Sequence, residues 1–249
     1  MKVVCTIEAR MRSTRLPGKV LAPILGKPSL ELMIERLRRA KRVDAIVIAT
    51  TDNPADQPIE DLARRLGVGF FRGSEEDVMD RVLKAAWQAE ADVIVETTGD
   101  CPVIDPEVID RVIETFMTNN LDYCSNVIER TYPRGMDVEV FWYRHLEETA
   151  QATTDPTDRE HVSTFFYKHA DRYRRLNVAG SLPPDAVELR LTVDTPQDLD
   201  LITRIYEALY PGKTDFSLQD ILDLVRRRPE LKDINRDIKH KSVFSEKSL

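Results

Sequence analysis

Basic side chains are concentrated in one short segment near the N-terminus. Residues 10–19, Arg-Met-Arg-Ser-Thr-Arg-Leu-Pro-Gly-Lys, hold three arginines, one lysine and two hydroxyl groups, and they follow the apolar run at 2–7. Guanidinium groups and backbone amides in a turn suit phosphate oxygens, and like charges this close repel one another unless an anion shares the site. The segment predicts a phosphate site; a solvated basic loop is the alternative.

Two carboxylates follow other apolar runs. Asp100 comes just after residues 91–98, in the segment Thr-Thr-Gly-Asp-Cys-Pro, and Asp194 just after residues 188–193. Taken singly, Asp100 is also explained as a turn residue and Asp194 as the N-cap of a helix that Pro196 opens. Taken together with a bound triphosphate, they form the type of site that Mg²⁺ prefers, namely one or two carboxylates plus substrate phosphates.

Other familiar sites are missing from the sequence. The pattern GxxxxGK[ST] does not occur, and no GxGxxG follows the first apolar run, which argues against a P-loop NTPase and a dinucleotide dehydrogenase. Cys5, Cys101 and Cys124 lack CxxC spacing, so we expect reduced thiols in a cytosol. Cys101 is interpreted as a small, semi-buried filler rather than a reactive thiol.

The elements that would position these side chains alternate in type. Short apolar runs at 2–7, 45–50, 68–71 and 91–98 predict strands, and helical spacing at 29–42, 59–66, 78–91 and 106–119 predicts helices, the last with Asp105 as N-cap. Strands that are buried on both faces and alternate with helices indicate a three-layer α/β fold, with a mainly parallel sheet between two helical layers. Ligands bind at the carboxyl edge of such sheets.

The second half of the chain follows a looser pattern. We expect a half-exposed strand at 136–143, helices at 144–152 and 159–170, a strand at 188–193, and helices at 198–209 and 218–228, which together form a mixed edge or lid. This predicts one domain over 1–231, with a nucleotide-binding half at 1–126 and an acceptor and dimerisation half at 127–231. The polar tail at 232–249 is expected to be partly mobile.

Composition narrows the classes of partner. The 249 residues carry a net charge of −7, which argues against general nucleic-acid binding. No signal-type segment is visible, and no run approaches the roughly 20 apolar residues of a membrane span. We therefore expect a cytoplasmic protein that binds neither nucleic acid nor membrane.

Several motifs resemble one enzyme family. Residues 9–21, ARMRSTRLPGKVL, resemble the (A/R)xxSxRxPxK signature of the cytidylyltransferases that activate 3-deoxy-manno-octulosonate and acylneuraminates. GDCP at 99–102 and VDTPQDL at 193–199 are similar to two further motifs of that family. RGSEEDVMDR, YPRGMDVEVF and DREHVS look most like its spore coat polysaccharide biosynthesis protein F branch. The resemblance spans about residues 2–210 and implies the nucleotide-diphospho-sugar transferase fold.

The resemblance also implies an activity, which is transfer of CMP from CTP to an acidic sugar-like acceptor with release of pyrophosphate. Its motifs imply CTP contacts at Ala9, Arg10, Arg12, Ser13, Arg15, Lys19, Asp77, Asp80, Arg81, Thr98 and Gly99; Mg²⁺ at Asp100 and Asp194; catalytic roles for Arg10, Arg15, Lys19 and Asp100; and an acceptor side at Arg134, Asp137, Glu139, Glu160 and His161. Homodimers are usual in the family.

Other interpretations stay open at this point. The octulosonate enzymes carry HxSGTDR where this chain has RGSEEDVMDR, so the acceptor is not determined. Glu160 and His161 also suit a helix-surface pair or a subunit contact. Phe141, Trp142 and Tyr143 suit either a second subunit or the core. Another nucleotide, a phosphorylated acceptor or a non-catalytic nucleotide-binding protein are the alternative functions. No strong general base is evident, and Asp100 and a metal-bound hydroxyl of the acceptor are the candidates.

Overall fold

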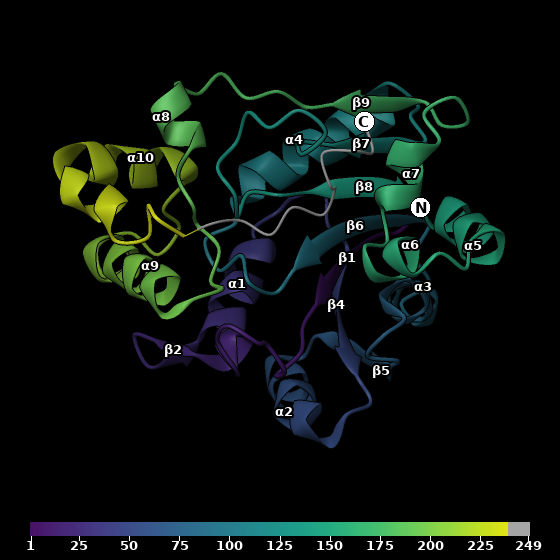
Figure 1. Ribbon diagram of the computed structural model, residues 1–249, viewed down its shortest axis with the longest axis horizontal. Coiled ribbons are helices and arrows are strands. Elements are labelled where there is room, and N and C mark those ends of the chain that lie inside the picture. The colour runs from purple at the N-terminus through teal and green to yellow at the C-terminus, as the bar shows by residue number, and fades with distance from the viewer. Residues whose placement is uncertain (239–249) are drawn as a thin grey trace.

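A seven-stranded sheet forms the centre of the molecule in the computed structural model, which describes residues 1–238. The strand order is β5-β4-β1-β6-β8-β7-β9 (Figure 1). The strands are β1 Val3–Glu8, β4 Ala45–Thr51, β5 Gly69–Gly73, β6 Val93–Thr98, β7 Tyr123–Ser125, β8 Glu139–Trp142 and β9 Arg175–Asn177. Strands β5, β4, β1 and β6 are parallel, whereas β8 is antiparallel to both of its neighbours. The predicted mainly parallel sheet with a mixed edge is confirmed.

Helices cover both faces of this sheet (Figure 1). One layer contains α1 Ser29–Leu37, α2 Gln57–Leu66, α4 Pro106–Thr118, α9 Pro196–Leu209 and α10 Leu218–Arg227. The other contains α3 Val78–Gln88, α5 Tyr143–Ala152 and α7 Thr164–Lys168, with α6 Pro156–Glu160 packed on α3. Smaller elements are β2 Pro23–Ile24, β3 Lys27–Pro28, α8 Pro184–Val187 and the 3-10 turns η1 Lys19–Leu21, η2 Pro54–Asp56 and η3 Pro229–Asp233.

Local sequence explains the main elements. In β1, Cys5 and Ile7 enter one core cluster and Val4 enters the other, because alternate residues of a strand face opposite sides. This double burial accounts for the unbroken apolar runs. Asp105 accepts a hydrogen bond from the Glu107 amide at 2.8 Å, which confirms it as the N-cap of α4.

Two predicted elements are wrong. Residues 188–193 form no strand and make only an isolated bridge between Arg134 and Arg190, because the segments beside them are loops rather than strands. The helix predicted at 159–170 is divided into α6 and α7. Val162 lies at the break with a φ of 40°, a left-handed conformation that a right-handed helix excludes.

The strand predicted at 136–143 is confirmed over Glu139–Trp142 as β8, but its half-exposed character is wrong. Strand β8 runs inside the sheet between β6 and β7, and Phe141 is fully buried. Trp142 packs on Phe116 with ring centroids 5.2 Å apart, and Tyr143 begins α5. Phe141 therefore belongs to the core of this chain, and the dimer stays a prediction that needs another surface.

The ends of the predicted segments differ in detail. Helix α1 stops at Leu37 and α3 at Gln88, each a few residues earlier than expected. The predicted tail begins inside η3, and its remainder from 239 to 249 lies outside the described residues. Within residues 1–238 no helix combines the length and apolar character needed to cross a membrane.

Candidate active site

The basic loop between β1 and η1 is closed by backbone contacts. The Gly18 amide donates to the Met11 carbonyl at 2.8 Å, and Gly18 has a φ of 72°, which a residue with a Cβ adopts only at a cost. The Met11 amide in turn donates to the Asp56 carboxylate at 2.7 Å. The loop therefore has a defined path beyond the carboxyl end of β1.

Lys19 lies between the two predicted metal ligands. Its Nζ is 2.7 Å from Asp100 Oδ2 and 2.6 Å from Asp194 Oδ1. Arg15 adds a second contact to Asp194, with 3.0 Å between Nη2 and Oδ2. The structure thus brings together three segments that are far apart in sequence, and both carboxylates converge on one positively charged point.

The contacts among Lys19, Asp100 and Asp194 shift the pKa values of Lys19 and Asp100. Burial alone would raise the pKa of Asp100, but the Lys19 ammonium outweighs it and holds that pKa below its usual value. Burial would likewise lower the pKa of Lys19, and the two carboxylates together raise it. Both groups therefore stay ionised at neutral pH.

A close approach of two strands places Asp100. The Gly99 amide donates to the Glu8 carbonyl at 2.8 Å, and a Cβ on Gly99 would lie 3.0 Å from that oxygen. Thr98 Oγ1 donates to Asp100 Oδ1 at 2.6 Å. Gly99 thus permits the contact that carries the chain from β6 into the site, and Thr98 orients the carboxylate.

Backbone contacts place Asp194. The Val193 amide donates to the Asp100 carbonyl at 2.8 Å, which couples the two acidic segments directly. Thr195 caps α9 through a capping box with Asp198, so the alternative in which Asp194 is the N-cap is wrong. The Asp194 side chain is left for the site.

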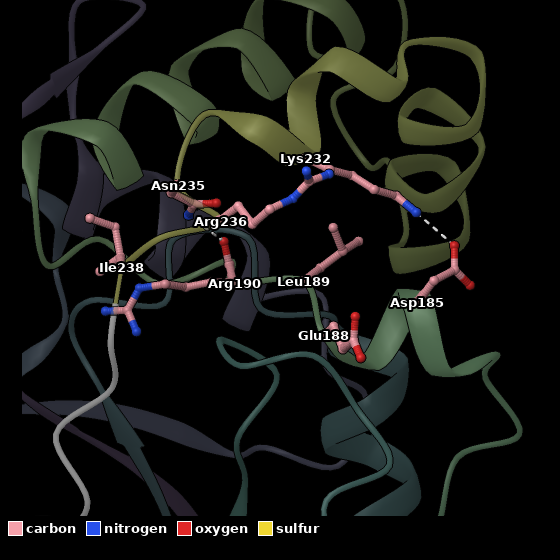
Figure 2. Close-up of a pocket in the computed structure, with 8 residues that line it drawn as sticks. All are labelled: Asp185, Glu188, Leu189, Arg190, Lys232, Asn235, Arg236 and Ile238. Atoms are coloured by element: carbon pink, nitrogen blue, oxygen red, sulfur yellow. Dashed lines mark hydrogen bonds and ion pairs between the residues drawn. The ribbon is translucent and has the colours of Figure 1, made fainter.

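Arg190 supports Asp194 from behind, a role that the sequence did not reveal. Its guanidinium donates to Asp194 and to the fully buried Asp198. Arg190 also lines a separate cavity of about 430 Å³, in which Lys232 contacts Asp185 at 2.6 Å (Figure 2). The sequence pattern around Arg190 gave little indication of this role, because a charged residue within an apolar run is equally typical of the exposed face of a strand.

A cavity of about 410 Å³ opens over the basic loop. The residues that line it and that were predicted as site residues from the sequence are Ala9, Arg10, Arg12, Ser13, Arg15, Lys19, Arg81, Thr98, Gly99, Asp100, Glu160, His161 and Asp194. Glu8, Thr14, Val20 and Val78 also line it and were not predicted. A volume of this size suits a small-molecule ligand.

Five predicted residues do not line this cavity. Asp77 caps α3 and accepts from Arg159, while Asp80 pairs with Lys84 at 2.7 Å. These contacts give both aspartates structural roles on α3.

The other three lie in the half of the chain that was predicted to form the acceptor side. Arg130 binds Asp137 through two hydrogen bonds of 2.7 and 2.9 Å, and Glu139 accepts from the Tyr167 hydroxyl at 2.6 Å. The Arg134 carbonyl accepts from the Leu191 amide at 2.8 Å, which ties this segment to the one that carries Asp194.

Two further groups define the chemistry of the cavity. Burial raises the pKa of Glu8 to about 7, so this carboxyl titrates near neutrality. Cys101 is buried beside Asp100, and burial raises the pKa of its thiol well above the usual value. A thiol held protonated is a poor nucleophile, which agrees with the filler interpretation.

Comparisons with known proteins agree with the motifs. The model of the cytidylyltransferase family matches residues 4–219. Spore coat polysaccharide biosynthesis protein SpsF of Bacillus subtilis is 34% identical over 92% of this chain and 95% of its own length. The structure of a cytidylyltransferase from Leptospira borgpetersenii has a TM-score of 0.89 and 33% identity, covering 96% of this chain and 100% of that chain.

Shorter or more distant matches point the same way. A 3-deoxy-manno-octulosonate cytidylyltransferase of Geobacter metallireducens is 37% identical over 45% of this chain and 44% of its own. An 8-amino-3,8-dideoxy-manno-octulosonate cytidylyltransferase of Shewanella amazonensis is 35% identical over 47% and 48%. A CMP-2-keto-3-deoxy-manno-octonic acid synthetase complexed with CTP shares the fold, with a TM-score of 0.63, 22% identity and coverage of 84% and 99%.

The family model spans most of the chain, and one relative and one solved structure match it almost end to end. The resemblance carried by the N-terminal signature is therefore confirmed. This chain belongs to the cytidylyltransferase family and is a CTP-dependent nucleotidyltransferase.

Proposed function

We propose that the protein transfers CMP from CTP to an acidic sugar and releases pyrophosphate, as a step in the synthesis of a surface polysaccharide or glycoconjugate. The observation that carries this proposal is the convergence of Asp100 and Asp194 on Lys19 beside the basic loop. The names of the relatives, among them a spore coat polysaccharide protein and octulosonate enzymes, support the class of acceptor.

The proposed cofactor is Mg²⁺, held by Asp100 and Asp194. Their oxygens already meet at one cation, the Lys19 ammonium, so the pair fits a metal ion once Lys19 turns toward a phosphate. No cluster of three or more potential ligands within residues 1–238 is arranged to hold a metal, so CTP phosphates must complete the coordination. When bound, Mg²⁺ neutralises phosphate charge and helps to orient the triphosphate.

The residues of the chain bind and position the reactants. Arg10, Arg15 and Lys19 contact the phosphates and balance the charge that builds up as an acceptor oxygen attacks the α-phosphorus and pyrophosphate leaves. Arg10 is held over the cavity by Glu75 at 3.4 Å, a long and exposed contact that a phosphate can displace. The low pKa of Asp100 makes it a weak base, so its part is to bind rather than to accept a proton.

The acceptor is expected to enter beside Glu160 and His161, at the end of α6, because both line the cavity. A homodimer and a cytoplasmic location complete the proposal. The three free cysteines, all buried, suit a reducing compartment.

The proposal is tested by incubating the protein with CTP, Mg²⁺ and a panel of sugar acids and sugar phosphates while pyrophosphate release is measured. We expect release with a sugar acid, and about 100-fold less in Asp100→Asn and Asp194→Asn because charge stabilisation of this kind is worth several kcal/mol. Asp80→Asn, outside the cavity, is the matched control. Full activity in both site variants would refute the metal assignment, and faster release from another nucleotide would refute CTP as the donor.

A further inference from the structure

Three glutamates share one face of the sheet next to the cavity. Glu8 ends β1, Glu96 lies on β6 and Glu139 on β8. Glu96 and Glu139 are direct partners in the antiparallel pair, and the carboxyl groups of Glu8 and Glu96 are in hydrogen-bonding contact. Like charges directly opposite each other destabilise a sheet, and burial raises the pKa of all three carboxyl groups, so in the absence of a cation the cluster retains protons.

The cation whose charge acts on this cluster, Arg81, is engaged with backbone carbonyl groups. None of the three carboxylates forms an ion pair within residues 1–238. The positive charge of Arg81 favours the ionised form of Glu8, but its guanidinium donates to the carbonyl oxygens of Ala49, at 3.2 Å, and of Ser74. The side chains that donate to Glu139 are the hydroxyl groups of Tyr123 and Tyr167, which carry no charge.

Glu96 carries the clearest sign of a missing partner. Its side chain is only 8% exposed, and its Oε2 atom receives no hydrogen bond from any described residue. Glu139, by contrast, accepts from the hydroxyls of Tyr123 and Tyr167. A buried carboxylate oxygen without a donor is costly, and a ligand that brings a donor would be stabilised there.

We propose that Glu8, Glu96 and Glu139 form a subsite for an ammonium group, so that the acceptor is an acidic sugar that also carries a free amine. This deepens the function proposed above and rests on it. An ammonium has three N–H donors and a full positive charge, whereas a hydroxyl has one donor and none.

The charges along the cavity agree with such a ligand. Glu8 lines the same cavity as Arg10, Lys19 and Arg81. A zwitterionic sugar therefore finds basic groups for its carboxylate and Glu8 for its amine within one space, while Glu96 and Glu139 follow on β6 and β8 and do not line the cavity. Within residues 1–238 no three His, Cys, Asp or Glu side chains are arranged so that they could hold a metal ion. The glutamate cluster therefore does not fit a second metal.

The test compares acceptors that differ only in an amino or a hydroxyl group. The pairs are 8-amino-3,8-dideoxy-manno-octulosonate with 3-deoxy-manno-octulosonate, and 2-amino-2-deoxyglucuronate with glucuronate. Binding to the full chain loaded with CTP and Mg²⁺ is measured by saturation-transfer NMR, together with pyrophosphate release. We expect the amino member of at least one pair to bind about tenfold tighter, as one charge-assisted hydrogen bond predicts.

Glu96→Gln should remove this preference, because it keeps the shape of the side chain but cannot form the carboxylate that would pair with an ammonium group. Glu31→Gln is the control, since Glu31 is a buried glutamate of α1 that pairs with Arg65 away from the cavity. Equal binding within both pairs, or no binding of any amino sugar, would overturn the inference. An unchanged preference in Glu96→Gln, together with a shifted pH profile of pyrophosphate release, would also overturn the inference. It would show that the cluster binds and releases a proton instead of holding an ammonium group. Calorimetric titration of CTP into the same samples tests the proposed function separately.

Discussion

Lys19 has two possible partners in this site, the carboxylates in the free protein and a phosphate when CTP is bound. Its ammonium lies within 2.7 Å of both aspartates, whose side chains are about one-sixth exposed. Partly buried carboxylates that lose their cation are left with an uncompensated charge. The residue therefore contributes to folding in the absence of ligand and to binding in its presence.

Replacement of Lys19 should separate these roles. We predict that Lys19→Met lowers the free energy of unfolding by roughly 1–3 kcal/mol, because two charged groups lose a donor. Added MgCl₂ should recover part of that loss, since the ion can take the place of the ammonium. The measurement is Tm with and without MgCl₂. Lys27→Met is the control, as Lys27 pairs with Glu35 elsewhere, and equal Mg²⁺ effects in both variants would contradict the metal site.

Glu8 should make stability depend on pH. Burial raises its pKa from 4.5 to about 7, so the folded protein binds a proton that the unfolded chain has already released. The stabilising effect of that proton is fully present below the unfolded pKa of 4.5 and is lost as the pH rises through the folded value of about 7. Because Glu8 and Glu96 interact, the titration belongs to the pair.

The corresponding variant is Glu8→Gln. Its free energy of unfolding relative to the natural protein should rise between about pH 5 and pH 8, by on the order of 1–3 kcal/mol. Urea denaturation across this range gives the difference at each pH. Parallel curves for the two proteins would show that Glu8 does not titrate in this range.

At the scale of elements, the contact between the Arg134 segment and residues 190–194 sets the position of Asp194. Gly135 has a φ of 99°, and a Cβ there would lie 2.6 Å from the Leu191 carbonyl oxygen. The neighbouring Arg134 carbonyl accepts from the Leu191 amide at 2.8 Å. A side chain at 135 would push this segment away, and Asp194 follows three residues later.

Two glycine variants test this mechanical link. Gly135→Ala should lower the free energy of unfolding by about 2 kcal/mol or more and also reduce pyrophosphate release, because both the backbone strain and the clash act on the segment next to Asp194. Gly67→Ala shares the left-handed conformation, with a φ of 64°, but has open space for a Cβ. Gly67→Ala should lower the free energy of unfolding by about 1 kcal/mol and leave pyrophosphate release intact. Equal losses of activity in the two variants would show that position 135 acts only through global stability.

At the scale of the whole molecule, the parts predicted correctly from the sequence are those coded locally. The basic loop and Asp100 each follow a buried strand, and a parallel sheet brings such ends to one edge, so their meeting could be predicted without coordinates. Asp194 reached the same place although its strand was wrong, because the Val193 amide donates to the Asp100 carbonyl and so ties the Asp194 segment to the site.

The incorrect predictions concern features that depend on which face of the sheet a residue occupies and which segments lie next to it. Strand β8 alternates like an exposed strand, yet it became central because β7 and β9 lie beyond it, and neither was predicted. Glu139 thus belongs to the cluster of Glu8, Glu96 and Glu139 on the sheet rather than to the cavity lining. Glu96 went unnoticed because a charge within an apolar run carries no signal of its partners, and the pairing with Glu139 exists only in the folded sheet.

Calorimetric titration of CTP with and without MgCl₂ tests whether the basic loop, Asp100 and Asp194 together form a metal-dependent CTP site. We expect the natural protein to bind CTP about tenfold or more tightly when MgCl₂ is present, and Asp194→Asn to lose this gain while it retains weaker binding through the loop. CTP affinity that is the same with and without MgCl₂ in the natural protein, or a gain that persists in Asp194→Asn, would contradict it.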